Sequence, residues 1–112
     1  MKKLSELIKR KLTFPISQEG QYFSVDRLGE IYACVLGNVY AFGMKEDIEN
    51  EIEEYDVTKV NNDCENWLDK NFPYLEVKSK EHITILNNIA SLNDEDGCSK
   101  EQISKWLAAR GY

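Results

Sequence analysis

Residues 79–112 carry the most complete set of helix signals in this sequence. Ser99 is a preferred N-cap residue, and Gln102 stands three positions later, where its side chain can return a hydrogen bond to the Ser99 N–H. These two residues form the pattern of a capping box, and Gly111 stands where a left-handed residue often ends a helix. The sequence therefore predicts a final helix over residues 99–110, with Trp106 as its main anchor in the core.

A second helix is expected immediately before this one, beginning near Ser79. It ends at residues 93–97, a polar run that closes in Gly97 and is typical of a turn. Two helices joined by so short a connection form a helical hairpin. The apolar residues of the earlier helix recur at helical spacing: Ile85, Leu86, Ile89, Ala90 and Leu92.

The acidic turn of this hairpin argues against two familiar functions. If Gly97 is the sixth residue of a calcium-binding EF-hand loop, Leu92 is the first and Ile103 the twelfth, and neither can bind calcium. In a DNA-binding helix-turn-helix, the carboxylates of the turn would meet DNA phosphates, which disfavours binding. A helix-turn-helix-like regulatory domain stays as an alternative function.

The remaining residues predict a mainly helical, small α+β fold. Residues 21–33 contain two runs of β-forming side chains around a turn signal at 26–29, which indicates one short β-hairpin. With the C-terminal helical hairpin, we expect about five helices in a single globular domain spanning residues 1–112. Further helices are expected from apolar periodicity over residues 2–12, 45–55 and 57–72, and residues 74–78 are expected as an extended connector or edge strand.

Residues 33–42 are nearly all apolar, so their periodicity does not separate a buried strand from a buried helix. We favour a helix, because Ala33, Gly37 and Ala41 would then share one face and allow another element to approach closely. The alternative is a second β-hairpin with its turn at Gly37-Asn38.

The helix expected over residues 45–55 is strongly acidic. We expect Ile48, Ile52 and Tyr55 to face inward from it, and Asp56 to cap the following helix. Its exposed carboxylates would favour a partner with a basic surface. Six acidic residues of this helix are the candidate partner-binding residues, together with Trp106: Glu46, Asp47, Glu49, Glu51, Glu53 and Glu54.

The overall charge excludes some partners. Twenty acidic and fourteen basic residues give the 112-residue chain a formal net charge of −6, which disfavours direct binding to nucleic acid. No apolar run is long enough to span a membrane, and we expect no membrane association. The three cysteines are odd in number and widely spaced, which favours a reducing, cytoplasmic location.

A nucleophilic cysteine paired with a histidine is the alternative that would make this protein an enzyme. His82 is the single histidine, and Cys98 or Cys34 would be its partner. We expect structural roles for the cysteines instead, because Cys34 and Cys64 stand in apolar runs. The spacing of these residues matches no zinc motif, so we expect no catalytic residue, metal or cofactor.

Three short motifs occur in the same order along the chain: Asp26-Arg27-Leu28-Gly29, Cys34-Val35-Leu36-Gly37, and Asn93-Asp94 with Gly97-Cys98-Ser99. Together they resemble a class of short bacterial and phage proteins without an assigned function. Asn38 departs from the small residue usual after the Cys-x-Leu-Gly motif. The resemblance implies a helical domain and carries no activity.

The function we expect is that of a small acidic protein-binding module. A phage or mobile element would encode it, and it would act in the host cytoplasm. Its acidic surface would inhibit or modulate a basic, nucleic-acid-handling protein of the host by competing for the nucleic-acid site.

Overall fold

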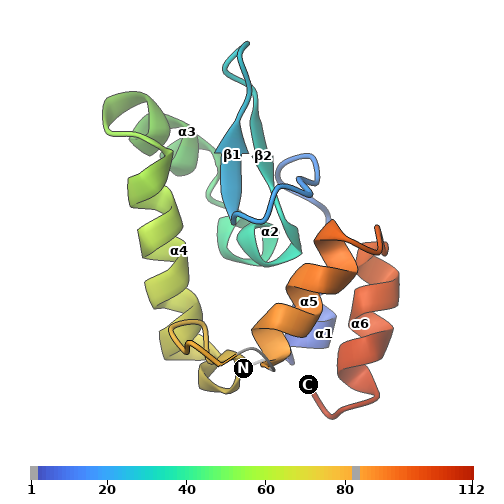
Figure 1. Ribbon diagram of the computed structural model, residues 1–112. Helices are drawn as coiled ribbons and strands as arrows, with labels where there is room; N and C mark the ends of the chain where they lie inside the picture. Colours follow the sequence, from blue (N-terminus) through green and yellow to red (C-terminus); the bar gives the residue numbers. More distant parts are fainter. Residues whose placement is uncertain (1–2, 82–83) are drawn as a thin grey trace.

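Helices and one β-hairpin account for most of the chain, as the sequence predicts. The computed structural model describes residues 3–81 and 84–112, and in these residues it shows six α-helices and one two-stranded antiparallel sheet (Figure 1). The mainly helical α+β prediction is therefore confirmed. The elements are α1 (Leu4–Ile8), β1 (Phe23–Val25), β2 (Ile31–Ala33), α2 (Val35–Ala41), α3 (Lys45–Glu54), α4 (Val57–Asn71), a 3₁₀ turn η1 (Pro73–Leu75), α5 (Ile85–Asp94) and α6 (Lys100–Ala108).

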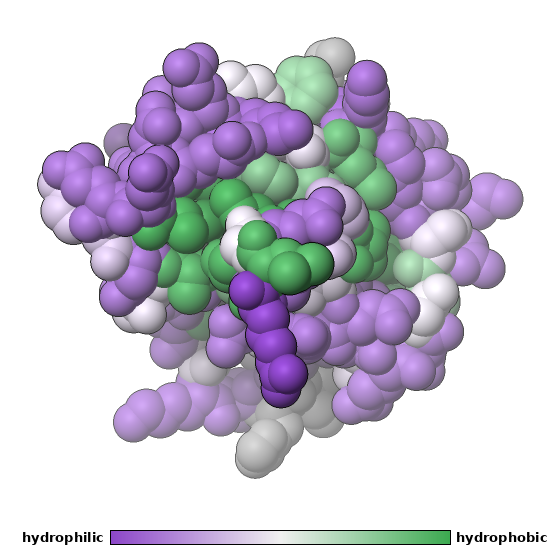
Figure 2. All heavy atoms as spheres, turned by 90° about the horizontal axis from the view of Figure 1, so that it is seen from above, coloured by the Kyte–Doolittle hydropathy of each residue, from purple (hydrophilic) through white to green (hydrophobic). Residues whose placement is uncertain are grey.

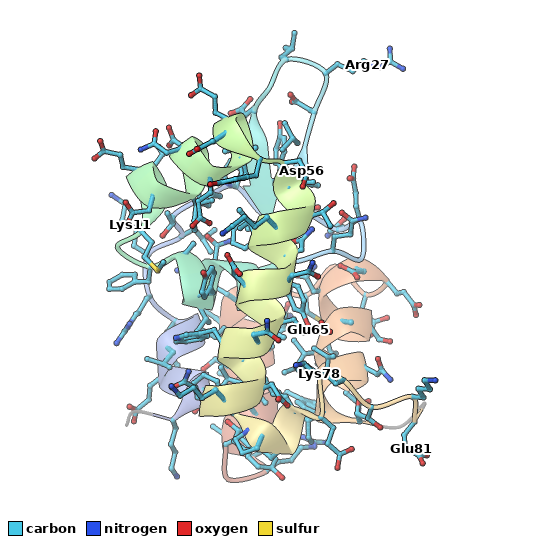
Figure 3. All side chains as sticks on the ribbon, turned by 90° about the vertical axis from the view of Figure 1, so that its left-hand side faces the viewer. Lys11, Arg27, Asp56, Glu65, Lys78 and Glu81 are labelled. Carbon is cyan, nitrogen blue, oxygen red and sulfur yellow. The ribbon has the colours of Figure 1, made fainter. Side chains whose placement is uncertain are left out.

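Side-chain caps fix where several helices begin. Ser99 Oγ accepts from the Gln102 N–H at 3.2 Å, and Gln102 Oε1 accepts from the Ser99 N–H at 2.8 Å, which confirms the capping box. Asp56 Oδ1 accepts from the Thr58 N–H at 2.8 Å at the start of α4, also as predicted. Asp56 is visible at the upper end of this helix in Figure 3.

The predicted start of α5 near Ser79 is wrong. The helix begins at Ile85, because Thr84 has an extended backbone and its side chain accepts from the Asn87 N–H at 3.0 Å. Thr84 is therefore an N-cap and the described residues before it are not helical.

Two further boundaries differ from the prediction. Helix α1 ends at Ile8, and the Lys100 ammonium donates to the carbonyl oxygens of Lys9 and Arg10 at 3.2 and 2.8 Å, which satisfies acceptors at that end. Residues 74–78 are neither an extended connector nor an edge strand. The 3₁₀ turn begins at Pro73, and Glu76 follows it with a left-handed φ of 53°, so the chain turns there.

Residues 35–41 form a helix, so the alternative of a second β-hairpin is excluded. Gly37 allows the close approach that the sequence predicts. A Cβ at this position would lie 2.3 Å from the carbonyl oxygen of Tyr22 and 3.2 Å from the Ala33 Cβ. Only glycine fits here without a shift of the backbone that leads into β1.

The β-hairpin has the register Phe23↔Ala33, Ser24↔Tyr32 and Val25↔Ile31. Asp26 organises its tip, because Asp26 Oδ1 accepts from the backbone N–H groups of Leu28 and Glu30, each at 2.9 Å. Gly29 has a φ of +81°, which suits this tight turn. The hairpin extends beyond the helical body at the top of Figure 1.

Three asparagines attach the surrounding chain to the hairpin and to α2. Asn38 Oδ1 accepts from the N–H groups of Thr13 and Phe14 at 3.0 and 2.9 Å. Asn93 Nδ2 donates to the Ser17 carbonyl at 2.9 Å. Asn61 bonds to the backbone of Phe23 from α4. These amides satisfy backbone groups that lie outside regular ladders.

The core corrects two predictions about side-chain burial. Tyr55 is 60% exposed and its ring lies below the Lys59 ammonium, 5.4 Å from the ring centre, whereas Ile48 is buried and Ile52 half-buried. Trp106 is half-buried, and the Arg110 guanidinium lies 3.9 Å from its ring centre.

The main anchors of α6 are Ile103 and Leu107, which are fully buried. They face the core because α6 packs mainly on α1, with a smaller contact to α5. Buried Ser104 supports this packing, since its hydroxyl donates to the Ser5 carbonyl at 2.6 Å.

Seven aromatic rings form a continuous series through the core, in which each ring contacts the next. Their edge-to-face contacts have ring centres 5.6 to 6.3 Å apart, and the last pair is stacked at 4.3 Å. This series connects the segment before the hairpin to the C-terminus. The rings are Phe14, Phe23, Tyr40, Trp67, Phe72, Tyr74 and Tyr112.

Candidate functional site

A cavity of about 530 Å³ lies between the β-hairpin, α3 and the segment of residues 13–15. We call it the hairpin groove. Figure 2, which looks down on the hairpin, shows hydrophobic side chains near the centre of this face, surrounded by hydrophilic ones. The apolar lining of the groove consists of Phe14, Pro15, Val25, Ile31 and Ile52.

Acidic residues border the hairpin groove. Glu30 comes from the hairpin, and Glu49 and Glu53 lie one helical turn apart on α3. Among the residues that the structure describes, Lys45 is the one basic residue that lines the groove, and its ammonium lies 3.9 Å from Glu49. Three carboxylates therefore face one ammonium around an apolar floor, which favours a ligand that is both cationic and apolar.

The structure divides the six acidic residues predicted on α3. Glu49 and Glu53 line the groove, whereas Glu51 turns toward α4 and lies 3.5 Å from the Lys59 ammonium. A hydrogen bond to Asp63 at 2.9 Å raises the pKa of Lys59, and Glu51 adds to this effect. The remaining three are exposed and line neither of the two cavities described here: Glu46, Asp47 and Glu54.

The tip of the hairpin presents a large apolar side chain to solvent. Leu28 is 92% exposed, although such residues are uncommon in a tight turn. Its backbone is held by Asp26, and the hydrogen bond from the Glu30 N–H, with that from Leu28, lowers the pKa of the Asp26 carboxyl. Neighbouring Arg27 points away from the body (Figure 3). The tip therefore holds an exposed apolar side chain on a turn that Asp26 fixes by hydrogen bonds.

Backbone hydrogen bonding at the edges of the hairpin follows from its register. At the two ends of the hairpin, the Cys34 N–H donates to Tyr22 and the Asp26 N–H donates to Glu30. Hydrogen-bonded and non-hydrogen-bonded pairs alternate along an antiparallel ladder. The backbone N–H and carbonyl groups of the pairs Phe23↔Ala33 and Val25↔Ile31 therefore point outward. Ala33 bonds to Pro15 and Ser17. Phe23 bonds to Asn61, as described above. Within the described part of the chain, no comparable partner meets the outward groups of Ile31.

A second cavity, of about 380 Å³, lies among α2, α4 and α5 and contains Cys34. Burial raises the pKa of the Cys34 thiol to about 11, and burial also raises the pKa of Cys64 well above its usual value. Glu65 also lines this cavity, on the side of α4 that faces α5 (Figure 3). Thiols with raised pKa values are poor nucleophiles at neutral pH.

The predicted Cys–His pair is only partly tested by this geometry. His82 lies outside the described residues, so its distance from the three cysteines is not part of the structure. In the residues that the structure describes, no group of three or more His, Cys, Asp or Glu side chains is placed to hold a metal ion. No helix among them is long and apolar enough to cross a membrane.

The structure does not bring Trp106 together with the acidic helix. Helix α6 lies on the opposite side of the molecule from α3, at the lower right of Figure 1 where α3 is at the upper left. Trp106 and the α3 carboxylates therefore do not share one surface. A binding role for Trp106 stays a separate prediction.

Sequence reasoning missed the hairpin groove and its apolar lining. One signal was present: Leu28 is an apolar residue inside a polar turn motif, where packing within the hairpin does not require it. Phe14 and Ile31 gave no such signal, because apolar residues at these positions are equally expected in the core.

Comparison of the chain with protein-family models, with curated proteins and with solved structures gave no match. The resemblance based on the three short motifs therefore stays a prediction. The proposals below depend on the geometry of the hairpin groove and its surroundings.

Proposed function

We propose that this protein is a small acidic binding module that docks on a basic partner protein through the hairpin groove, the tip of the hairpin and the exposed carboxylates of α3. In its most specific form, the proposal names a nucleic-acid-handling protein of a host cell as the partner. The module would be encoded by a phage or mobile element and would inhibit or modulate this partner in the cytoplasm.

One observation carries the proposal. A 92% exposed Leu28 stands beside an apolar groove that three carboxylates border. Protein interfaces combine an apolar centre with a polar rim, and this surface has both parts. The carboxylates would increase the rate of encounter with a basic surface, and burial of the apolar side chains would slow dissociation.

Competition with nucleic acid explains why such a module would be acidic. A protein that binds nucleic acid presents arginine and lysine side chains to phosphates. Glu49 and Glu53 at the groove, together with exposed Glu46, Asp47 and Glu54, present negative charge from α3. The module would bind in place of nucleic acid while making no contact with nucleic acid itself.

Capture of a partner from bacterial lysate tests the proposal. Wild-type protein is immobilised and compared with Glu49→Lys/Glu53→Lys, which reverses two charges at the groove. The control is Asp69→Lys/Glu95→Lys, which makes the same change of charge at two exposed positions on α4 and after α5. We expect a partner that the wild type and the control retain and the groove variant loses.

Competition with nucleic acid decides between a specific partner and general attraction of charge. Added duplex DNA should displace the module from the captured partner, because both would occupy the same basic surface. Equal capture by the groove variant and by the control would contradict the proposal, as would the absence of any enriched protein at low and at moderate salt.

A further inference from the structure

We infer that the partner contributes an extended segment that pairs with the backbone of Ile31 at the open edge of β2, with apolar side chains in the hairpin groove and basic side chains on its acidic border. This inference rests on the proposed function and names the kind of segment that the groove binds. It is recognition by strand addition, in which backbone hydrogen bonds supply part of the affinity.

The edge of β2 is already used by the chain itself at Ala33, two residues from Ile31. The Ala33 N–H donates to the Pro15 carbonyl and the Ala33 carbonyl accepts from the Ser17 N–H, at 3.0 and 2.9 Å. Residues 15–17 thus bond to β2 in the manner of a parallel neighbour, with a bridge between Ile16 and Ala33. The backbone of β2 therefore has the geometry needed for a further strand.

The chain leaves this edge before it reaches Ile31. Asn38 Oδ1 accepts from the N–H groups of both Thr13 and Phe14, and this draws residues 13–14 toward α2. Two residues along β2 from Ala33, the outward N–H and carbonyl of Ile31 are left at the wall of the groove. An extended guest segment would complete the ladder at this position.

The opposite edge of the hairpin offers less room for a guest. At β1, the side chain of Asn61 holds both outward groups of Phe23, and α4 lies behind it. The outward groups of Val25 on β1, like those of Ile31, have no partner among the described residues. Strand addition is assigned to β2 because residues 15–17 already pair with that edge, and the two variants below test this choice.

The lining of the groove defines the chemistry of the guest. Side chains alternate between two sides of an extended chain, so every second residue of the guest faces the groove. Phe14, Ile31 and Ile52 supply apolar contacts for these residues. Glu30, Glu49 and Glu53 would attract lysine or arginine at the positions between them. The guest is an alternating basic and apolar segment.

A fluorescent heptapeptide, Lys-Val-Lys-Val-Lys-Val-Lys, is the probe. Fluorescence anisotropy should show saturable binding to the wild-type protein. The same peptide with every valine and internal lysine N-methylated keeps its charges and side chains but loses its backbone donors whichever way it runs along β2, and we expect it to bind about tenfold more weakly. A peptide with glutamate in place of lysine should not bind.

Two matched protein variants test which edge is used. Ile31→Pro removes an outward N–H from β2, and Val25→Pro removes the equivalent N–H from β1. Both substitutions remove an apolar side chain from the same face of the hairpin. We expect Ile31→Pro to weaken peptide binding about tenfold and Val25→Pro to have a much smaller effect. Circular dichroism and thermal unfolding check that both variants fold.

The outcomes separate this inference from the proposed function. Equal affinity for the N-methylated and parent peptides, or no saturable binding of the heptapeptide, would overturn strand addition while capture of a basic partner stands. If the protein alone forms a dimer that Ile31→Pro dissociates, the guest is a second copy of this chain and the inference is overturned. Partner capture that survives Glu49→Lys/Glu53→Lys would remove the proposed function itself.

Discussion

The side chain of Asn61 pairs with both backbone polar groups of Phe23. Its Oδ1 accepts from the Phe23 N–H at 2.8 Å, and its Nδ2 donates to the Phe23 carbonyl at 3.2 Å. An amide on α4 thus takes the place of a neighbouring strand at the edge of β1. It also fixes the position of the hairpin relative to the helices, and with it one wall of the hairpin groove.

Replacing Asn61 should therefore destabilise the protein. Asn61→Ala leaves the N–H and carbonyl of Phe23 without their partner, and we expect a loss of about 2 kcal/mol in the free energy of unfolding. Asn62→Ala is the control, because Asn62 is exposed on the same helix. Urea unfolding of both variants measures the difference, and equal midpoints would show that the pair contributes nothing.

Gly37→Ala should lower the stability of the protein by more than the addition of one methyl group suggests. The added Cβ would lie 2.3 Å from the Tyr22 carbonyl oxygen, so α2 or the start of the hairpin must move. We expect a loss of about 2 to 3 kcal/mol from overpacking, although alanine favours a helix. Thermal unfolding measures the effect, and an unchanged melting temperature would contradict the close approach.

Two substitutions in α6 and one at its N-cap test which residues stabilise this helix. Ile103→Ala should cost about 3 to 4 kcal/mol because Ile103 is fully buried. Ser99→Ala should cost about 1 kcal/mol through loss of the capping box. Trp106→Ala should cost less than Ile103→Ala, since the indole is only half-buried. Denaturant midpoints give the order, and a larger loss for Trp106→Ala would reverse our assignment.

The reactivity of Cys34 should depend steeply on pH. With a pKa of about 11, roughly one thiol in a thousand is ionised at pH 8, so alkylation by iodoacetamide should be slow and rise about tenfold per pH unit. Mass spectrometry of the labelled peptide measures the rate. Fast labelling of Cys34 at pH 6 in the folded protein would instead support the Cys–His enzyme alternative.

Acid should loosen the tip of the hairpin. The pKa of Asp26 is lower in the folded chain, because the carboxylate accepts hydrogen bonds from the Glu30 and Leu28 N–H groups. Its contribution to stability is therefore complete above the unfolded pKa near 3.9 and is lost as the pH falls through the lower folded value. Amide chemical shifts of Leu28 and Glu30 should report this change. Shifts that titrate at or above the unfolded pKa would contradict it.

The sequence predicted those elements whose signals are local. The capping box of Ser99 and Gln102, the Asp56 cap and the hairpin turn each depend on residues a few positions apart. The start of α5 escaped prediction because Ser79 and Thr84 can both cap a helix, and only the fold selects between them.

The hairpin groove depends on contacts between distant residues. Asn38 draws residues 13–14 away from β2 over more than twenty positions, and nothing in the local sequence indicates this. The same reason explains the error at Trp106: its burial depends on where α1 packs against α6, not on the period of α6 alone. The acidic character of α3 and the apolar Leu28 in its polar turn were accessible from local sequence, and the structure selects Glu49 and Glu53 from the acidic residues.

The series of aromatic rings provides an intrinsic spectroscopic signal for binding in the groove. Phe14 forms part of the groove and contacts Phe23, which contacts Tyr40, which in turn lies against Trp67. A guest that displaces Phe14 would alter the asymmetric surroundings of the Trp67 indole, three contacts away. Near-ultraviolet circular dichroism could then follow occupancy of the groove without any attached dye, while Trp106 beneath Arg110 reports separately on α6.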